Sequence, residues 1–374
     1  MPRYLLDART ATDHFPGIGR YVSALARALA PLLAPDEELI LLHDPARPSR
    51  WALPAVGAQV RLLPAGAGPF SPAQQWQMPS LLRRERADVY HSPYYLMPYR
   101  PGIPTVVTLY DLIPEQFPEV VSLRARLLFR IAMRLALRAA DHVITISEST
   151  RRDLLARYRV RQQRLWVIPL APDARFQPAG AEAIAAARRQ YGLPQRFALY
   201  VGSNKPHKNL TRLVESWSLL GDQMGEEAPP LCIAGAWDAR YPQPQERAEA
   251  LQLGSRVRFL GPVAEEALPA LYSGATLFVF PSLYEGFGLP VVEAMACGAP
   301  VACSRRASLT EVGGDAAVYF EPTATGEIAQ AAGALLQDDV RRRRLAEQGK
   351  RQAASFSWRE TAQRTLDCYR ALAG

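Results

Sequence analysis

At 374 residues the chain exceeds the size of one ordinary hydrophobic core, and we expect two domains of roughly 100–200 residues each. Because 48% of the residues are hydrophobic, both domains can bury a core. No stretch of about 20 uncharged apolar residues occurs, and the first residues, MPRYLLDAR, lack the pattern of a signal peptide. These features exclude a membrane-spanning protein and favour a soluble protein of the cytoplasm.

The cysteines and histidines do not form the spacings of a metal site or a disulfide framework. Cys232, Cys297, Cys303 and Cys368 lie far apart or in apolar runs, and the five histidines show no His-x3-His or Glu-x-x-His spacing. We therefore expect buried thiols, no metal and no cofactor.

Short apolar runs typical of buried strands alternate with helical stretches, which indicates an α/β fold with parallel sheets covered on both faces. A segment rich in Pro, Ala and Gly, 169–183, is typical of a linker between two such series. We predict two doubly wound, Rossmann-like domains, 1–172 and 173–354, facing each other across a cleft, with a last helix over 355–374 that crosses back to the first domain. The predicted strands are 3–8, 38–43, 59–64, 88–92, 105–110, 142–147, 164–169, 196–202, 230–236, 256–261, 276–281, 299–304 and 317–322.

The strongest motif is FVFPSLYEGFGLPVVEAMACGAPVACS, residues 278–304. A buried strand ends at Pro281, a glycine-rich loop follows, and Pro290 occupies a position where a helix tolerates the missing N–H. Glu285 lies in the loop and Glu293 lies in the first helical turn. The pattern predicts an anion site between two carboxylates.

That site has the chemistry of a nucleotide-sugar pocket. Gly286 and Gly288 let the backbone approach a ligand, and the free N–H groups at 289–292 can hold a diphosphate. Glu293 can accept hydrogen bonds from ribose hydroxyls, and Glu285 from sugar hydroxyls. The alternative is that the glycines only form a tight turn and Glu293 only complements the helix dipole.

The second motif, YVGSNKPHKNLTRLVESW at 200–217, joins a strand to an amphipathic helix through a short loop. Lys208, just before the helix, can place a compact positive charge on the same diphosphate, with Lys205 assisting. The only other lysine is Lys350, so chance placement of two lysines here is improbable. We expect His207 to lie on the surface of the loop.

Two further segments follow predicted strands of the first domain. In 10–25, Gly17 and Gly19 precede a helix, and with Asp44 they form a weak dinucleotide-binding fingerprint that keeps an NAD-type oxidoreductase open as an alternative. At the end of 105–110, Asp111 is expected to point out of the sheet edge and to orient the acceptor or the donor sugar.

The segment 278–304 resembles the donor-binding Glu-x7-Glu motif of family 4 glycosyltransferases, which have the GT-B fold. Strand, glycines, proline, both glutamates and the following Gly298-Ala299-Pro300 occur in the family's order, and GRYV, DLIP, Lys208-Asn209 and FSWRETAQRTLDCY extend the resemblance along the chain. It implies a retaining, metal-independent hexosyltransferase that moves a sugar from a nucleotide diphosphate sugar to a glycan or lipid-linked acceptor in polysaccharide assembly. GIGRY and DLIP most resemble bacterial mannosyl- or rhamnosyltransferases, so GDP-mannose is the first donor to consider.

The resemblance also assigns the two domains and their residues. It implies that 1–172 binds the acceptor and that 173–354 binds the donor. Two departures from the family stand out: Ser203 replaces an arginine, for which Lys205 would substitute, and Tyr110 replaces a histidine that touches the donor sugar. The implied catalytic residues are Glu285, Asp111 and Lys208; the donor residues are Gly202, Ser203, Lys205, Lys208, Val263, Glu285, Gly286, Phe287, Gly288, Leu289 and Glu293; and the acceptor side has His14, Gly17, Gly19, Arg20, Tyr110 and the aromatic segment 91–99.

Two alternative functions are not enzymatic. A catalytically idle nucleotide-sugar-binding protein would use the same donor motifs, and only the acceptor-side loop argues against it. A nucleic-acid partner is not expected, because the aromatic residues are not interleaved with the arginines as base-stacking platforms would require.

The net charge of +8 is concentrated in 121–164, which holds eleven arginines and three acidic residues. Within it, Arg126, Arg130, Arg134 and Arg138 recur every four residues and are predicted to form one basic stripe on a helix. The stripe is either a solvated face or, with Arg151, Arg152, Arg157 and Arg159, a contact to an anionic membrane surface at the inner face of the membrane.

Overall fold

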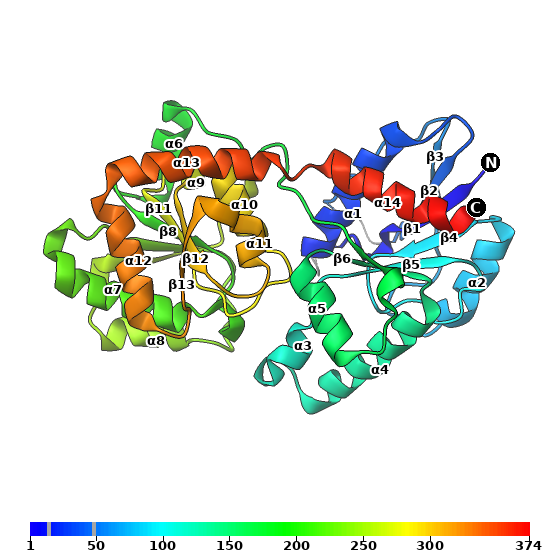
Figure 1. Cartoon of the computed structure of the whole chain (residues 1–374), viewed down its shortest axis with the longest axis horizontal. Coiled ribbons are helices and arrows are strands. Elements are labelled where there is room, and N and C mark those ends of the chain that lie inside the picture. Colours follow the sequence, from blue (N-terminus) through cyan, green and yellow to red (C-terminus); the bar gives the residue numbers. More distant parts are fainter. Residues whose placement is uncertain (13–15, 47–49) are drawn as a thin grey trace. The chain divides into compact units, whose positions relative to one another are not determined.

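The computed structural model describes residues 1–12, 16–46 and 50–374, and the chain divides into two compact units (Figure 1). Unit 1 comprises Met1–Leu170 and Ser357–Gly374, and unit 2 comprises Ala171–Phe356. The divisions expected from the sequence, after 172 and after 354, lie two residues from these points. In the described ranges, no helix is both long enough and apolar enough to cross a membrane.

Unit 1 contains a seven-stranded sheet in the order β3-β2-β1-β4-β5-β6-β7, and all of its neighbouring strands are parallel. The strands are β1 (Arg3–Asp7), β2 (Glu38–His43), β3 (Val60–Pro64), β4 (Val89–Ser92), β5 (Thr105–Leu109), β6 (His142–Thr145) and β7 (Leu165–Val167). The helices are α1 (Pro16–Leu29), α2 (Gln74–Arg84), α3 (Ile113–Gln116), α4 (Leu123–Ala139), α5 (Glu148–Arg157) and α14 (Trp358–Ala373), with 3-10 turns at Ala8–Thr10, Ala30–Leu32, Pro118–Val120 and Gln162–Arg164.

Unit 2 repeats this plan with a six-stranded parallel sheet in the order β10-β9-β8-β11-β12-β13. The strands are β8 (Ala198–Val201), β9 (Leu231–Ala234), β10 (Val257–Gly261), β11 (Leu277–Phe280), β12 (Val301–Ser304) and β13 (Ala317–Phe320). The helices are α6 (Ala181–Tyr191), α7 (Leu210–Met224), α8 (Gln243–Ala250), α9 (Leu268–Gly274), α10 (Leu289–Ala296), α11 (Leu309–Gly313), α12 (Thr325–Gln337) and α13 (Asp339–Ala354), with 3-10 turns at Pro206–Lys208, Gly225–Glu227, Gly254–Arg256, Glu265–Ala267 and Gly314–Ala316.

The predicted fold class, two doubly wound α/β units, is confirmed. Each of the thirteen predicted apolar runs contains one of the thirteen strands found in the described residues, and several runs extend past the strand at one or both ends. The predicted runs are longer than the strands because the buried loop residues that follow a strand are as apolar as the strand itself. Pro281, for example, was included in a predicted strand and lies buried in the loop after β11.

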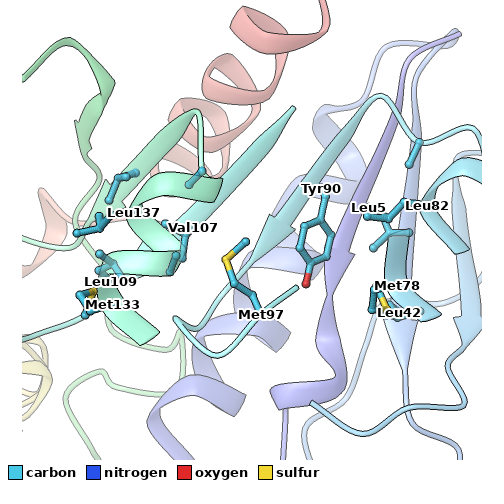
Figure 2. Packing of buried hydrophobic residues seen from close by; sticks show 14 of the residues in the cluster. Leu5, Leu42, Met78, Leu82, Tyr90, Met97, Val107, Leu109, Met133 and Leu137 are labelled. Carbon is cyan, nitrogen blue, oxygen red and sulfur yellow. The ribbon is translucent and has the colours of Figure 1, made fainter. Parts of the chain in front are cut away.

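The core of unit 1 fills the space between the sheet and its helices (Figure 2). In Figure 2, Met133 and Leu137 of α4 lie beside Val107 and Leu109 of β5, so the inner face of this helix packs on the sheet. The helix begins at a serine cap, since the Ser122 side chain accepts a hydrogen bond from the backbone N–H of Ala125.

The arginines of α4 do not form the single stripe expected from the sequence. Arg130 pairs with Glu115 at 3.2 Å and Arg126 is half-buried, whereas Arg134 and Arg138 are exposed. The physical reason is that a spacing of four residues advances about 40° around a helix of 3.6 residues per turn. Three steps cover about 120°, so Arg126 and Arg130 reach the flank beside the core residues Met133 and Leu137.

The last helix, α14, packs on α1 and β4 of unit 1. A buried hydrogen-bonded chain ties them together: the Tyr21 and Thr108 hydroxyls are 3.0 Å apart, Thr108 Oγ1 lies 2.8 Å from His91 Nε2, and His91 Nδ1 lies 2.6 Å from the Tyr369 hydroxyl. Burial lowers the pKa of His91 to about 3, so this imidazole is neutral in the folded protein.

That neutral histidine predicts a loss of stability in mild acid. His91 takes up a proton below about pH 6.5 in the unfolded chain but only near pH 3 in the folded one, so the free energy of unfolding falls as the pH drops between these values. Replacing His91 with Asn should reduce the slope between about pH 6.5 and about pH 5 by up to about 1.4 kcal/mol per pH unit, measured by urea unfolding. An unchanged slope in the variant would contradict a neutral buried His91.

Candidate active site

The order of the strands in unit 2 reverses between β8 and β11, and the loops that follow these two strands diverge there. In doubly wound sheets, ligands bind at this reversal, beyond the carboxyl ends of the strands. Lys208 follows β8 and Glu285 follows β11, and their side chains form an ion pair with Nζ 2.7 Å from Oε1. The two residues belong to two different sequence motifs, and the fold brings them into direct contact.

The pair lies in a sheltered position. The two side chains are 17% and 11% exposed, and the Lys208 ammonium lies 5.5 Å from the centre of the Phe280 ring at the end of β11. An aromatic face favours a nearby cation, and reduced contact with water strengthens the attraction between the two charges.

The loop after β11 is held in one conformation before α10 begins. Gly288 has φ of +103°, a left-handed conformation that other residues rarely adopt, and a Cβ at this position would lie 2.6 Å from Leu309 Cδ2. The hydroxyl of the buried Ser308 lies 2.9 Å and 2.8 Å from the carbonyl oxygens of Glu285 and Phe287 and shares its proton between them. The Phe287 ring packs edge-on against Phe356.

The loop after β8 is bonded to the loop after β11. Asn209, at φ +61°, donates from Nδ2 to the carbonyl oxygens of Pro281 (3.1 Å) and Pro322 (2.7 Å). The backbone N–H of Leu283 donates to the carbonyl of His207 at 2.8 Å. These bonds hold Lys208 and Glu285 within reach of each other without relying on their charges.

His207 corrects one sequence expectation. It is 4% exposed and does not lie on the loop surface. Burial, followed by the charges of Lys208 and Lys205, lowers the pKa of His207 to about 3. The histidine is therefore neutral, and the positive charge of this loop comes from Lys208 and from the exposed Lys205.

Gly202 and Ser203, at the end of β8, lie against neighbouring backbone. The Tyr200 hydroxyl donates to the carbonyl of Ser203 at 3.0 Å, and a Cβ on Gly235 would collide with the Gly202 carbonyl. A side chain at Gly235 would push the loop after β8 out of place, so this glycine is required by a close approach of two backbones.

The other residues predicted to bind the donor differ in how far they are buried. Glu293 is buried on α10 and accepts a hydrogen bond from the Tyr272 hydroxyl at 3.3 Å, while Leu289 is half-exposed at the start of the same helix. Gly286 is buried in the loop beside Glu285. Val263 is half-exposed after β10, which β9 separates from β8, so the sheet does not bring Val263 to the strand reversal.

Asp111 follows β5 in unit 1, beside an aromatic cluster. One carboxylate oxygen accepts a hydrogen bond at 2.9 Å from the backbone N–H of Ile113, the first residue of α3. The Tyr94 and Tyr95 rings lie 4.3 Å apart between centroids. The Tyr94 hydroxyl donates to the Tyr95 hydroxyl at 3.0 Å. Burial raises the pKa of both tyrosines, and the negative charge of Asp111 adds to that rise.

Tyr110, which replaces the family's histidine, packs edge-on against Tyr21 with centroids 5.5 Å apart. Its hydroxyl is buried and has no hydrogen-bond partner in the part of the chain that the structure describes. A buried polar atom of this kind normally costs free energy, which makes the Tyr110 hydroxyl a candidate for contact with a bound ligand.

The predicted loop containing Gly17 and Gly19 needs a correction. Both glycines lie inside the first turn of α1, which begins at Pro16, and Gly19 is buried beside Trp51. Proline is compatible with the first turn of a helix, so α1 starts one residue before the first glycine. His14 lies outside the described residues, and Arg20 is half-buried on α1.

Sequence reasoning missed a buried charge cluster at the strand reversal of unit 1. Arg9 is 1% exposed and binds Asp7 through Nε (2.8 Å) and the Ala67 carbonyl through a terminal nitrogen (2.7 Å). The Tyr90 hydroxyl also donates to Asp7, at 2.7 Å. Asp7 ends β1 much as Asp111 follows β5, so its position at a strand end is the sequence signal that points to it.

Groupings typical of metal sites are absent from the described ranges, where no three His, Cys, Asp or Glu residues are placed to hold an ion. All four cysteines are buried free thiols.

Comparison with known proteins identifies relatives of both units. Residues 16–175 match the model described as Glycosyltransferase Family 4, and residues 184–352 match the model described as Glycosyl transferases group 1. The O-antigen chain mannosyltransferase B of Escherichia coli is 32% identical over 301 residues, 78% of this chain and 76% of that protein. A serotype-specific mannosyltransferase WbdA of Escherichia coli is 31% identical over 270 residues, 70% of this chain and 33% of that longer protein.

Among solved structures, sucrose-phosphate synthase from Thermosynechococcus elongatus has a TM-score of 0.77 and 24% identity, covering 100% of this chain and 99% of that one. At this level of identity the likeness concerns the fold.

The Ser308 hydroxyl is expected to be required for the stability of unit 2. Ser308→Ala leaves two buried carbonyl oxygens without a donor, which should lower the free energy of unfolding by about 1–3 kcal/mol in a denaturant titration. The matched control is Ser355→Ala, which removes an exposed hydroxyl bonded to the Gln352 carbonyl and should change stability by less than about 0.5 kcal/mol. Equal effects of the two variants would refute the loop-fixing role.

Proposed function

The chain belongs to the family 4 glycosyltransferases, and from this premise we propose that it is a retaining, metal-independent enzyme with GDP-mannose as donor. The acceptor is a hydroxyl of a glycan or lipid-linked glycan in polysaccharide assembly. The choice of mannose is supported by the mannosyltransferase names of the two Escherichia coli relatives.

The observation that carries the proposal is the ion pair between Lys208 and Glu285 at the strand reversal of unit 2. A diphosphate is the stronger anion, so it competes with Glu285 for the lysine. Once Lys208 has turned to phosphate, the Glu285 carboxylate is available to sugar hydroxyls. A single donor molecule thus satisfies both members of the pair.

The remaining donor groups follow from α10. The backbone N–H of Leu289 and the positive end of the helix dipole lie just after Gly288, where they can bind the second phosphate; Pro290 has no N–H, and the Val291 N–H donates to the Gly288 carbonyl. Glu293, on the same helix, is assigned to the ribose hydroxyls. Lysine and helix start together supply the positive charge that a metal supplies in other transferases, which is the reason for proposing a metal-independent reaction.

The proposed reaction proceeds on one face of the sugar. The bond between the anomeric carbon and the phosphate oxygen breaks, a bond from the same carbon to the acceptor oxygen forms, and the acceptor proton passes to the departing phosphate. Asp111 orients the acceptor or the donor sugar. The protein contributes by positioning these groups and by stabilising the charge that develops on the phosphate.

Two alternatives make different predictions. A nucleotide-sugar-binding protein without activity would bind GDP-mannose and never turn it over. The NAD-type oxidoreductase rested on Gly17, Gly19 and Asp44; family membership favours the transferase, and both glycines lie within α1 instead of a loop between strand and helix.

Transfer from GDP-mannose to mannobiose should proceed in excess chelator, and the new linkage should have the α configuration of the donor when examined by proton NMR. UDP-glucose should be a poorer donor. Activity lost in chelator and restored by magnesium would overturn metal independence, a β linkage would overturn retention, and tight donor binding without turnover would favour the binding protein.

Variants of the ion pair should have opposite effects on GDP binding. Lys208→Ala should weaken GDP binding by about 10- to 100-fold and leave guanosine binding unchanged, because a charge-assisted hydrogen bond to phosphate is lost. Glu285→Ala should bind GDP at least as tightly as the wild type, because the competitor for Lys208 is gone, yet kcat should fall by about 100- to 1000-fold. Calorimetry and initial rates measure the two effects.

Matched controls are Lys350→Ala and Glu347→Ala, which break a surface pair of the same charges with 2.6 Å between its atoms. Both should retain wild-type binding and rate. If Glu285→Ala weakened GDP binding as much as Lys208→Ala, competition between carboxylate and phosphate would be excluded.

A further inference from the structure

One face of α4 in unit 1 combines exposed apolar and basic side chains, and we call it the α4 outer face. Leu123, Leu127, Leu128 and Ile131 are 82%, 59%, 66% and 45% exposed. Of the ten large hydrophobic side chains that are exposed in the described part of the chain, four therefore lie on this one helix of 17 residues. Three exposed arginines complete the face: Arg124, Arg134 and Arg138.

Helical geometry places these seven residues together. At about 100° per residue they occupy a sector of about 140°. The opposite sector carries Phe129, Met133, Ala136 and Leu137, which belong to the core of unit 1. The outer face therefore does not belong to the core of unit 1, because α4 packs on the sheet through a different apolar stripe.

The charges around the helix are distributed unevenly. The sequence of α4 contains five arginines and no acidic residue. The acidic Glu115 lies on the flank, where it binds Arg130 (3.2 Å) and the Tyr158 hydroxyl (2.7 Å). Among the described residues, Arg124, Arg134 and Arg138 form no ion pair, and the exposed acids nearest along the chain, Glu119 and Asp141, lie before and after the helix. The outer face is thus a cationic surface that also offers leucine side chains.

We propose that the α4 outer face binds the surface of an anionic lipid bilayer, with the helix lying in the plane of the interface. Apolar side chains enter the boundary between headgroups and acyl chains, and the interleaved guanidinium groups bind lipid phosphates. A lipid surface fits better than a protein partner, because helices that lie in a membrane interface combine leucine side chains with arginines that reach lipid phosphates, as the α4 outer face does.

This surface is separate from the residues proposed for transfer and does not require them. Binding through this face would place the proposed reaction at the surface of a bilayer, which is where a lipid-linked acceptor is anchored. Each arginine near an anionic surface contributes about 1 kcal/mol, so three arginines with partly inserted leucines give reversible, salt-sensitive attachment.

The test is co-sedimentation with vesicles of equal parts phosphatidylglycerol and phosphatidylcholine, in the absence of donor and acceptor. Wild-type protein should bind at low salt, should bind less at high salt, and should not bind pure phosphatidylcholine. The triple change Arg124→Gln, Arg134→Gln, Arg138→Gln should lower the partition coefficient by about 100-fold, the equivalent of about 1 kcal/mol for each arginine.

A matched control distinguishes this face from general positive charge. Arg343→Gln, Arg344→Gln, Arg351→Gln removes three exposed arginines from α13 of unit 2 and changes the net charge equally. It should lower binding by less than about threefold, since these residues lie outside the α4 outer face. Equal losses in the two triple variants would reduce the effect to net charge and overturn the proposal.

The apolar contribution is tested separately. Leu127→Gln, Leu128→Gln, Ile131→Gln keeps good helix formers and all arginines, yet should reduce binding by about tenfold or more because apolar insertion is lost. All four native cysteines are buried, so Leu128→Cys can carry an environment-sensitive fluorophore selectively. Its emission should shift to the blue with anionic vesicles. No shift and no sedimentation, or self-association that the glutamine variants abolish, would overturn the membrane assignment in favour of another occupant.

These results are independent of the proposed reaction. A protein that binds vesicles but lacks transferase activity would contradict only the proposed function. Transfer to mannobiose without vesicle binding would contradict only the role of α4.

Discussion

The chemistry of this protein depends on a constraint of its sheets: within each unit all strands are parallel, so their carboxyl ends meet at one edge. Helices cover the faces, and the chain order reverses once in each sheet, between β1 and β4 and between β8 and β11. At the second reversal the loops diverge, and Lys208 and Glu285 meet there although 77 positions separate them. Neutral hydrogen bonds from Asn209 and Ser308 hold the loops, so the charges can exchange partners without moving the backbone.

The fold was largely predictable because parallel strands buried on both faces must be continuous apolar runs. Such runs are visible in the sequence without knowledge of their partners, as the run ELILLH and strand β2 show by sharing both bounds. The start of α1 was less predictable. Two glycines suggested a loop, and only packing of the helix against its surroundings, with Gly19 beside Trp51, decides that the helix includes them.

Within the candidate site, sequence alone identified residues whose position follows from local chemistry. A glycine-rich turn and a helix start at Gly288 fix the surroundings of Glu285. The sequence alone did not reveal how deeply a residue is buried when that depends on contacts with residues distant along the chain. His207 is buried where the loop after β11 bonds to its carbonyl through the Leu283 N–H, and Arg9 is buried with Asp7 and the Ala67 carbonyl as its partners. The outer face of α4 was likewise hidden, because leucines in a sequence do not reveal whether they face a core or the solvent.

Unit 1 is built from two separate stretches of the chain, and this affects the order in which its elements are synthesised. Its last helix, α14, follows all of unit 2 in the chain, and the ribosome releases α14 only after every strand of unit 2 has been synthesised. Unit 2 can therefore complete its fold first, although synthesis begins with unit 1. Until the final residues emerge, α1 and β4 lack their cover, and His91 lacks the Tyr369 hydroxyl that faces it. Unit 1 therefore cannot complete the packing of α1 and β4 before α14 has been synthesised, whatever the order in which its other elements fold.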